Sequence, residues 1–586
     1  MTQVSTQASV QSRPLPRAQG SEVQRLAVVS DVNLANLSSL LSRGGDEGRG
    51  VRTRLLPFGE VIRPLLEESP REEGEGLLIW VRPESVLPGF RQLLDGSPPE
   101  SEALDQEVEE FMALVGQAAA RFPFTLMASW TPPPSTRGLG MLDMDPTQGV
   151  AGTLLRLNLA LARAAAAHPG IFLLDAARWM AAGDPVEAAR MWYLAKTPFS
   201  RPTLTAAAAD IQAALRGLRG RARKVVVVDL DDTLWGGILG DAGRDGLRLG
   251  GHDPIGEAYV DFQRALKALT RRGVVLAVVS KNDEATALDA IRTHPEMVLR
   301  PEDLAGWRIN WSDKARNVAE LAQELNLGLD SFVFIDDNPS ERGRVREALP
   351  QVLVPEWPSD PLRYAATLRS MDVFDLPSLN REDRERAQMY AAERQRKEAR
   401  SSVGSVDEWL RSLEIRVTAE PLSETNLPRA AQLLNKTNQM NLSTRRMTEG
   451  ELERWTTEPL HRLWTLRVED RFGDYGLTGI VSLALEPEAA RARIVDFVLS
   501  CRVFGRQVEE TMVHLALEAA REEGSAELVA TLVPTEKNAP CRTFWSERSG
   551  FETAPDGTFR RPVELAYPAP EFVTLLHLDS PEPASP

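Results

Sequence analysis

The stretch KVVVVDLDDTLWGGILG occupies residues 224–240 and opens on four consecutive valines. Such a run predicts a short strand that is buried on both faces, as the strands of parallel sheets are. The strand then ends in three acidic residues, Asp229, Asp231 and Asp232, followed by Thr233. Folding alone gives no reason to place carboxylates there, whereas a bound cation or phosphate group does.

Acidic and polar residues also follow other predicted strands. FVFIDD ends an apolar strand with Asp336 and Asp337, and LAVVSKND ends another at Ser280. WSDKARN opens a predicted helix with Lys314. Because ligands of open parallel sheets bind at the carboxyl ends of the strands, we expect these side chains to share one site.

The D-x-D-x-T spacing directs the side chains of Asp229 and Asp231 to one side and that of Asp232 to the other. Two neighbouring carboxylates repel each other unless a cation holds them, and hard oxygen ligands suit Mg²⁺. The hydroxyl of Ser280 and the ammonium group of Lys314 are suited to hold a phosphate. The sequence therefore predicts an acidic metal cradle beside a phosphate-binding site. The alternative is that these residues only cap helices and turns at strand ends.

This order of four motifs resembles the haloacid dehalogenase-like (HAD) superfamily of phosphotransferases. The resemblance implies an aspartyl-phosphate formed on Asp229, with Asp231 as the general acid and base. The implied Mg²⁺ ligands are Asp229, Asp231, Asp336 and Asp337. The implied phosphate-binding residues are Thr233, Ser280 and Lys314.

Length and composition bound the class of protein. The 586 residues favour about three or four domains, and 42% hydrophobic with 26% charged residues is ordinary for a globular protein. The net charge of -16 argues against a broad nucleic-acid-binding surface, so an acidic partner must meet a local basic patch. No apolar run reaches membrane-spanning length, and only two cysteines favour a reducing cytoplasm over a disulfide scaffold.

The order of apolar runs and helical stretches predicts an α/β fold class with several domains. The expected segments are a disordered tail over 1–24, an α/β unit over 25–220, a second α/β unit over 221–375, a charged connecting helix over 376–404 and an α+β unit over 405–580. In the last unit, RLWTLRVEDRFGDYGLTGIVSLALE predicts a strand pair around a Gly-Asp turn.

In the third unit, Cys501 follows the predicted strand ARIVDFVLS and precedes RVFG. A strand, an R-x-x-G sequence and an amphipathic helix resemble the pyrophosphate loop of the GNAT acetyltransferase fold, where amides at a helix start bind phosphate. Gln507 departs from the small residue usual in that loop, which disfavours coenzyme A. We hypothesise that the Cys501 thiol carries an acyl group in its place, with Arg502 and Arg506 favouring the thiolate. The alternative is a buried inert cysteine, which is what we expect of Cys541.

Six segments together resemble the FkbH-like proteins of polyketide biosynthesis: LDDTLWGGILGDAG, FIDDNPSER, LLNKTNQMNLSTRR, DRFGDYGLTGIV, LSCRVFGRQVEE and PTEKNAPCRTFW. The first unit resembles the SGNH-hydrolase-like part of longer members. It has no clear G-D-S, G-x-N-D or D-x-x-H block, so we expect it to be catalytically silent, with a docking or structural role.

The FkbH-like resemblance implies a glyceryl transfer. The chain would take D-1,3-bisphosphoglycerate, remove phosphate, and pass the glyceryl group through a Cys501 thioester to the phosphopantetheine of an acyl carrier protein. Asn435 and Asn438 are candidate contacts for the glyceryl hydroxyls, with ordinary helix-surface amides as the alternative. The candidate residues for docking an acidic carrier are Lys436, Arg445, Arg446, Arg502 and Arg506.

Two other functional classes stay open at this stage. The chain could be a Mg²⁺-dependent HAD phosphatase fused to a GNAT-like acyltransferase that uses ordinary coenzyme A, although Cys501 and Gln507 count against it. It could also be a non-catalytic scaffold that binds a carrier protein, although the intact D-x-D-x-T sequence at Asp229 argues against that.

Overall fold

The computed structural model describes residues 24–43, 50–67, 72, 74–97, 100–133, 137–168, 170–378, 389–390, 392–394, 396, 400, 405–437, 439–535 and 538–577. The predicted tail, apart from Gln24, and most of the predicted connecting helix lie outside these residues. The described residues form two compact units, one within 1–238, 247–268 and 314–384, the other within 239–246, 269–313 and 385–586. The predicted domain boundaries stay predictions. None of the described helices combines the length and apolar character that crossing a membrane requires.

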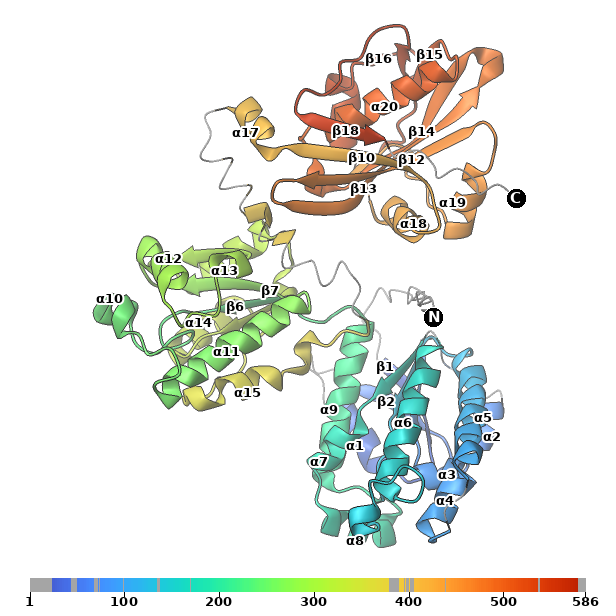
Figure 1. The fold of residues 1–586 in the computed structure, drawn as a ribbon, viewed down its shortest axis with the longest axis vertical. Helices are drawn as coiled ribbons and strands as arrows, with labels where there is room; N and C mark the ends of the chain where they lie inside the picture. The colour runs from blue at the N-terminus through green and yellow to red at the C-terminus, as the bar shows by residue number, and fades with distance from the viewer. Residues whose placement is uncertain are drawn as a thin grey trace, which may run out of the picture. The chain divides into compact units, whose positions relative to one another are not determined.

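The N-terminal part is a five-stranded parallel sheet in the order β2-β1-β3-β4-β5, with helices on both faces (Figure 1). Its strands are β1 (Gln24–Ser30), β2 (Val51–Leu55), β3 (Gly76–Trp80), β4 (Thr125–Ala128) and β5 (Ile171–Leu174). Its helices are α1 (Ala35–Arg43), α2 (Ile62–Leu66), α3 (Pro83–Val86), α4 (Pro88–Leu94), α5 (Ser101–Ala119), α6 (Val150–Ala166), α7 (Ala176–Ala181), α8 (Pro185–Ala195) and α9 (Arg201–Leu218).

Alternation along β1 explains how one strand serves two cores. Leu26 and Val28 pack with residues of α1, α7 and α9, whereas Ala27 and Val29 pack with residues of α4, α5 and α6. Because successive side chains of a strand point to opposite faces, a continuous apolar run is buried on both sides. The apolar run LAVVS at residues 26–30 therefore supplies side chains to both faces of the sheet.

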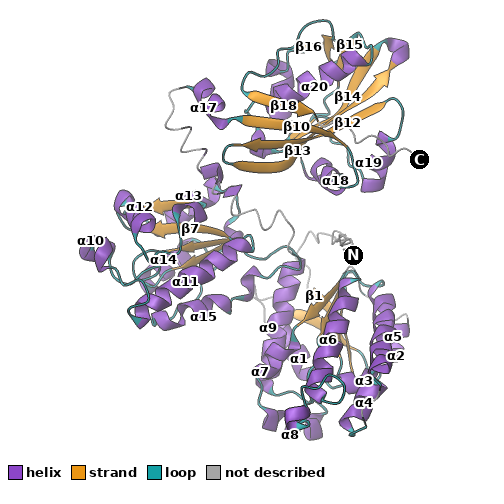
Figure 2. Cartoon of the chain, in the orientation of Figure 1, coloured by secondary structure: helices purple, strands orange, loops and turns teal. Residues whose placement is uncertain are grey.

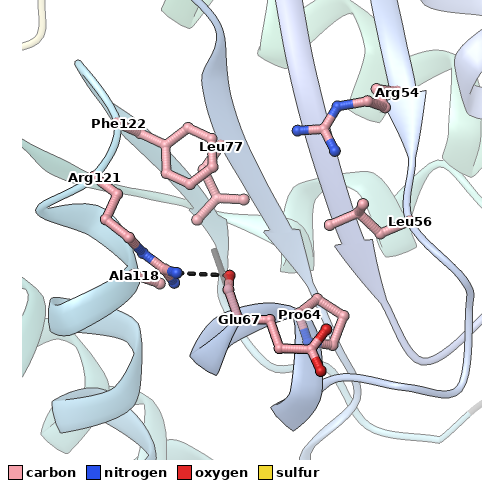
Figure 3. Close-up of a pocket in the computed structure, with 8 residues that line it drawn as sticks. All are labelled: Arg54, Leu56, Pro64, Glu67, Leu77, Ala118, Arg121 and Phe122. Atoms are coloured by element: carbon pink, nitrogen blue, oxygen red, sulfur yellow. Dashed lines mark hydrogen bonds between the residues drawn. The ribbon is translucent and has the colours of Figure 1, made fainter. Parts of the chain in front are cut away.

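A small pocket of this part is lined by Arg54, Leu56, Pro64, Glu67, Leu77, Ala118, Arg121 and Phe122 (Figure 3). Arg121 Nη1 donates to the carbonyl of Glu67 at 2.7 Å, and Arg54 pairs with Glu75 at 2.6 Å. Both guanidinium groups are therefore engaged within the fold, and we assign the pocket no ligand.

The strand-end serine and the histidine of the first sheet lie at opposite edges of that sheet. The hydroxyl of Ser30, at the end of β1, is buried and donates to the carbonyl of Trp80 at 2.7 Å. His168 is the one histidine between residues 25 and 220, and it precedes β5, so it lies at the amino end of the strands. The expectation that this part is catalytically silent stays a prediction.

The central part holds a four-stranded sheet in the order β8-β7-β6-β9, in which β6 pairs with β9 and β7 with β8 in parallel. The strands are β6 (Val225–Val228), β7 (Val275–Ser280), β8 (Gly306–Ile309) and β9 (Phe332–Ile335). The helices are α10 (Leu239–Ala242), α11 (Pro254–Arg271), α12 (Glu284–Thr293), α13 (Lys314–Glu324), α14 (Pro339–Ala348) and α15 (Tyr364–Arg369).

The C-terminal part is built on a nine-stranded mixed sheet in the order β16-β17-β15-β14-β13-β12-β10-β18, with β11 paired to β14 (Figure 2). Its strands are β10 (Ile415–Pro421), β11 (Met440–Asn441), β12 (His461–Asp470), β13 (Gly473–Glu486), β14 (Arg491–Leu499), β15 (Glu527–Ala530), β16 (Glu552–Thr553), β17 (Phe559–Pro562) and β18 (Val573–His577). Its helices are α17 (Val406–Leu413), α18 (Leu427–Lys436), α19 (Glu449–Thr456), α20 (Val508–Glu522) and α21 (Ala539–Thr543). The predicted α/β fold class is confirmed.

The predicted strand pair of this part is confirmed as β12 and β13, but its predicted turn is wrong. Gly473 and Asp474 belong to β13, and Asp470 pairs with Gly473, so the turn is Arg471 and Phe472. The carboxylate of Asp470 accepts the amides of Phe472 at 2.9 Å and Gly473 at 3.1 Å. The turn is therefore stabilised by Asp470, which bonds backbone amides of the turn, and not by the Gly-Asp pair that the sequence predicts.

Asp470 is also the centre of a buried ion-pair network, which we call the Asp470 network. Arg396 donates to both of its oxygens, at 2.7 and 2.8 Å, and the Tyr475 hydroxyl donates to it at 2.8 Å. Arg506 lies 3.8 Å from Asp470, donates to the Tyr475 hydroxyl, and pairs with Glu393 at 3.1 Å. Two guanidinium groups and two carboxylates therefore balance one another, and the network ties residues 393 and 396 to the sheet.

We expect Asp470→Ala to destabilise the protein by about 3–5 kcal/mol, because it leaves the Arg396 guanidinium buried without its partner. The neighbouring Glu469→Ala is a matched control. Its pair with Arg416 is exposed and 3.8 Å long, so its loss should cost less than about 1 kcal/mol. Urea unfolding followed by tryptophan fluorescence measures both, and equal shifts for the two variants would contradict a buried network.

Candidate active site

The register between β6 and β9 places two of the predicted acids side by side. The pairing runs from Val225 with Phe332 to Val228 with Ile335, and the amide of Asp229 donates to the carbonyl of Ile335 at 3.0 Å. Asp229 and Asp336 are the next residues on the two strands, at their carboxyl ends. All four residues of each strand are buried, so the apolar runs fix the register that brings the carboxylates together.

Lys314 is the first residue of α13 and inserts between these acids. Its Nζ lies 2.9 Å from Asp229 Oδ2 and 2.6 Å from Asp336 Oδ2, and all three side chains are buried. Burial opposes the charge on Lys314, but the charges of Asp229 and Asp336 raise its pKa above the ordinary value. The ammonium group therefore stays charged and holds the two carboxylates together.

Asp337 adds a third carboxylate to this group. Its amide donates to Thr233 Oγ1 at 3.1 Å, and that hydroxyl donates back to Asp337 Oδ1 at 3.2 Å. Among the described residues, oxygens of Asp229, Asp336 and Asp337 lie within 4.8 Å of one another, a spacing that could hold a metal ion. We call these three residues the carboxylate cluster.

The carboxylate cluster fits a hard divalent cation. Asp229 Oδ1 is buried and has no hydrogen-bond partner in the described part of the chain. Burial and the charge of Asp229 raise the pKa of Asp336 and of Asp337, because three carboxylates share one ammonium group. An oxygen-only donor set with an unsatisfied oxygen suits Mg²⁺.

The other residues of the predicted site lie as follows. Asp231 Oδ1 accepts from the indole of Trp235 at 2.9 Å, and its carboxylate is not part of the carboxylate cluster. Ser280 is the last residue of β7 and is buried. The predicted roles of Asp231 as a metal ligand and of Ser280 as a phosphate-binding residue stay predictions. Asp232 is exposed and adopts a left-handed backbone with φ of 52°.

Arg342 is a residue of this region that the sequence interpretation missed. It is buried in α14, and its Nη1 donates to the carbonyls of Asp336 and Asp337, both at 2.7 Å. The guanidinium group therefore fixes the backbone that carries two of the three carboxylates. Its position inside FIDDNPSERGR, one turn into the helix after the acids, was the available signal.

The predicted acyl-transfer loop begins where β14 ends, with Cys501 in a short turn after the strand. The placement of the Cys501 side chain lies outside the described features. The amide of Gly505 donates to Glu509 Oε1 at 2.9 Å, and Glu509 is buried at the start of α20. Gln507 adopts a left-handed backbone with φ of 62°. The Glu509 carboxylate thus accepts the amide hydrogen bond that the predicted pyrophosphate loop would donate to a phosphate.

Several residues predicted to meet the carrier or its glyceryl group are engaged elsewhere. Arg506 is buried in the Asp470 network, which does not fit its predicted place on a docking surface. Arg445 pairs with the buried Asp496, and both amide atoms of Asn435 bond the backbone of Met447. Arg502 is exposed and donates to Met389 Sδ at 3.4 Å, and Arg446 donates to the carbonyl of Leu434. Asn438 and the side chain of Lys436 lie outside the described features.

Cys541 fits its expected inert role. It is fully buried, and burial raises the pKa of its thiol to about 12. The thiolate, which is the reactive form, is therefore almost absent near neutral pH.

The structure is similar to the N-terminal part of the protein BF1531 from Bacteroides fragilis, a solved structure described as containing a phosphatase domain complexed with Mg. The two share 26% sequence identity with a TM-score of 0.53, over 61% of this chain and 94% of that one. This likeness supports the α/β fold class.

Shorter solved structures match about a quarter of the chain. They include the ribosomal-protein-S18-alanine N-acetyltransferase of Escherichia coli, at 13% identity over 26% of this chain and 96% of that one, with a TM-score of 0.20. Spermidine N-acetyltransferase of Vibrio cholerae in complex with CoA and spermine matches at 17% identity over 25% and 95%, with a TM-score of 0.21. At these scores the likeness carries no conclusion about this chain. No protein-family model matches the sequence. No curated protein sequence matches it.

Proposed function

We propose that the chain is a Mg²⁺-dependent phosphatase joined to an acyltransferase, and that it transfers a glyceryl group. The observation that carries the first half is the carboxylate cluster, in which Asp229 Oδ1 is buried at the end of a parallel strand and has no hydrogen-bond partner among the described residues. The solved Bacteroides fragilis structure, described as a phosphatase domain complexed with Mg, supports the same assignment. Asp229, Asp336 and Asp337 would hold Mg²⁺, which neutralises charge on the phosphoryl oxygens when bound.

The phosphoryl transfer would proceed in two balanced steps. A carboxylate oxygen of Asp229 attacks phosphorus, the bond from phosphorus to the leaving oxygen breaks, and Asp231 gives that oxygen a proton. Water then attacks the aspartyl-phosphate, Asp231 takes a proton from the water, and inorganic phosphate leaves. Lys314 and the hydroxyls of Thr233 and Ser280 would orient the phosphoryl oxygens.

The second half of the proposal concerns Cys501. A 1,3-bisphosphoglycerate carries an acyl phosphate, which a thiolate attacks with loss of phosphate, and a phosphate ester, which needs the site at Asp229. The Cys501 thiolate would form the carbon–sulfur bond while the acyl carbon–oxygen bond to phosphate breaks. The thiol of a carrier phosphopantetheine would then take the glyceryl group and return the proton to Cys501.

Transfer from coenzyme A is the second candidate for the C-terminal part. A pyrophosphate needs free amides at the start of α20, and Glu509 accepts the amide of Gly505 there. A buried carboxylate at that point also opposes a second anion. These contacts count against bound coenzyme A.

We expect Asp229→Asn to lower Mg²⁺-dependent phosphate release from p-nitrophenyl phosphate by at least about a thousandfold, because the amide cannot act as nucleophile. Asp289→Asn, an exposed aspartate on α12, is the matched control and should keep the activity. A colorimetric assay of the full chain with and without EDTA measures both. Activity that persists in Asp229→Asn would contradict the phosphatase assignment.

Mg²⁺ should also stabilise the wild-type chain, by about 2.7 kcal/mol at a concentration of 100 times its dissociation constant. Asp336→Asn should lose most of this stabilisation, because it removes one charged oxygen from the carboxylate cluster. Differential scanning fluorimetry across a Mg²⁺ titration reports the shift without any substrate. An unchanged shift in Asp336→Asn, relative to Asp289→Asn, would argue against this metal site.

Incubation with 1,3-bisphosphoglycerate should add one acyl group to the wild-type chain, seen by intact-protein mass spectrometry. Cys501→Ala should remove the adduct, whereas Cys541→Ala should keep it, since only about one part in ten thousand of a thiol with a pKa of about 12 ionises at pH 8. An adduct that survives in Cys501→Ala would exclude the proposed thioester. With a phosphopantetheinylated carrier present, the glyceryl mass should move to the carrier.

A further inference from the structure

The backbone of Asp232 is held in a conformation that aspartate adopts at a cost. Its φ of 52° lies in the left-handed region, where a side chain other than glycine is strained. Such a residue persists when its surroundings fix it from several sides. Its own carboxylate supplies one restraint, because Oδ1 accepts the amide of Gly237 at 2.7 Å.

Two tyrosines supply the other restraints. The Tyr259 hydroxyl donates to the carbonyl of Asp232 at 3.3 Å, and the Tyr364 hydroxyl donates to the same carbonyl at 3.2 Å. A carbonyl oxygen has two lone pairs, so the two phenols together satisfy it. Tyr259 comes from α11 and Tyr364 opens α15, which means that two separate helices hold one peptide of the loop.

The tyrosines are themselves held in place. Both are buried, and their rings meet edge to face with centroids 5.9 Å apart. Tyr364 also packs on Trp357, at 5.3 Å between centroids. A Cβ on Gly236 would lie 2.9 Å from Tyr259 Cε2, so the loop passes directly over that ring. Burial raises the pKa of both phenols, so they remain neutral donors.

The restrained peptide lies between Asp232 and Thr233, one residue after Asp231 of the candidate active site. Asp231 precedes Asp232, and Thr233 follows it and bonds Asp337 of the carboxylate cluster. Because the backbone angles of Asp232 set how Asp231 is oriented relative to Thr233, and Thr233 is anchored at Asp337, a change at Asp232 would move the Asp231 carboxylate relative to the carboxylate cluster. The bonds to the Asp232 carbonyl therefore help to fix the position from which the Asp231 carboxyl group would donate a proton.

We propose that Tyr259 and Tyr364 are positioning residues, which hold the Asp232 carbonyl so that Asp231 meets the leaving oxygen of the phosphate ester. This inference rests on the proposed phosphatase function. It concerns the geometry of the 231–237 loop and not the assembly of the carboxylate cluster, because neither hydroxyl bonds a cluster carboxylate in the described contacts.

The test uses the full chain with Tyr259→Phe, Tyr364→Phe and the double variant. Tyr193→Phe, which removes an exposed hydroxyl on α8, is the matched control. Turnover is measured with phenyl phosphate, a poor leaving group that needs a proton, and with p-nitrophenyl phosphate, which needs it less. We expect the double variant to lose about tenfold or more in kcat on phenyl phosphate, several times more than on p-nitrophenyl phosphate. Each single variant should lose less, since one donor remains.

Equal losses on both phosphates would overturn the proposal, because they would indicate damage to the metal or the nucleophile. Amide hydrogen exchange gives a second readout that needs no activity. Exchange across residues 231–237 should become about tenfold faster in the double variant, and should not change in Tyr193→Phe. Unchanged exchange in that segment would overturn the positioning role even if both phosphates are hydrolysed. If the wild type hydrolyses neither, the proposed function fails, while exchange still decides whether the tyrosines hold the loop.

Discussion

The contact between one lysine and two buried aspartates is the constraint on which the candidate site depends. Lys314 bonds Asp229 and Asp336 at 2.9 and 2.6 Å, and Asp337 completes the group. Three carboxylates against one ammonium group leave a net charge of minus two when all are ionised. A buried charge of that size is unfavourable, and a divalent cation cancels it. The bonds from Arg342 to the backbone therefore hold the carboxylates in an arrangement that a divalent cation would stabilise.

In the C-terminal part, the buried charges are paired with groups of the same part. In the Asp470 network two guanidinium groups meet two carboxylates, and at the start of α20 Glu509 takes the amide of Gly505. Burial raises the pKa of Glu509, so this position disfavours a negative charge. An incoming anion would meet an amide of Gly505 that is already bonded to Glu509. The two parts of the chain thus differ in what they offer a ligand, because the carboxylate cluster suits a cation whereas the amide of Gly505 is already bonded to Glu509.

The sequence predicts best those contacts that lie between residues at the ends of neighbouring strands. Four valines before Asp229 and FVFI before Asp336 predict two buried strands, and parallel pairing makes their ends meet whatever lies between them. The sequence predicts poorly those contacts in which a side chain bonds a backbone carbonyl or amide. The tyrosine bonds to the carbonyl of Asp232 join residues 27 and 132 positions apart and leave no pattern. Burial of a charged residue is equally hard to predict. The sequence places Arg506 on a docking surface, whereas partners distant in sequence bury it. Strand β2 leaves no clear apolar run in the sequence, because two arginines interrupt it.

The charges of the candidate site also impose an order on the proposed reaction. A phosphate ester is itself an anion, and the whole chain carries a net charge of -16, so no long-range field draws the substrate to these acids. With the carboxylate cluster uncompensated, the nucleophilic oxygen of Asp229 would face phosphoryl oxygens of the same sign. A divalent cation bound first would bring the carboxylate cluster and Lys314 together to neutrality, so the phosphoryl group would no longer meet a net negative charge. Metal before phosphate is therefore the sequence of binding that the electrostatics favour, and it makes the metal part of the substrate-binding surface.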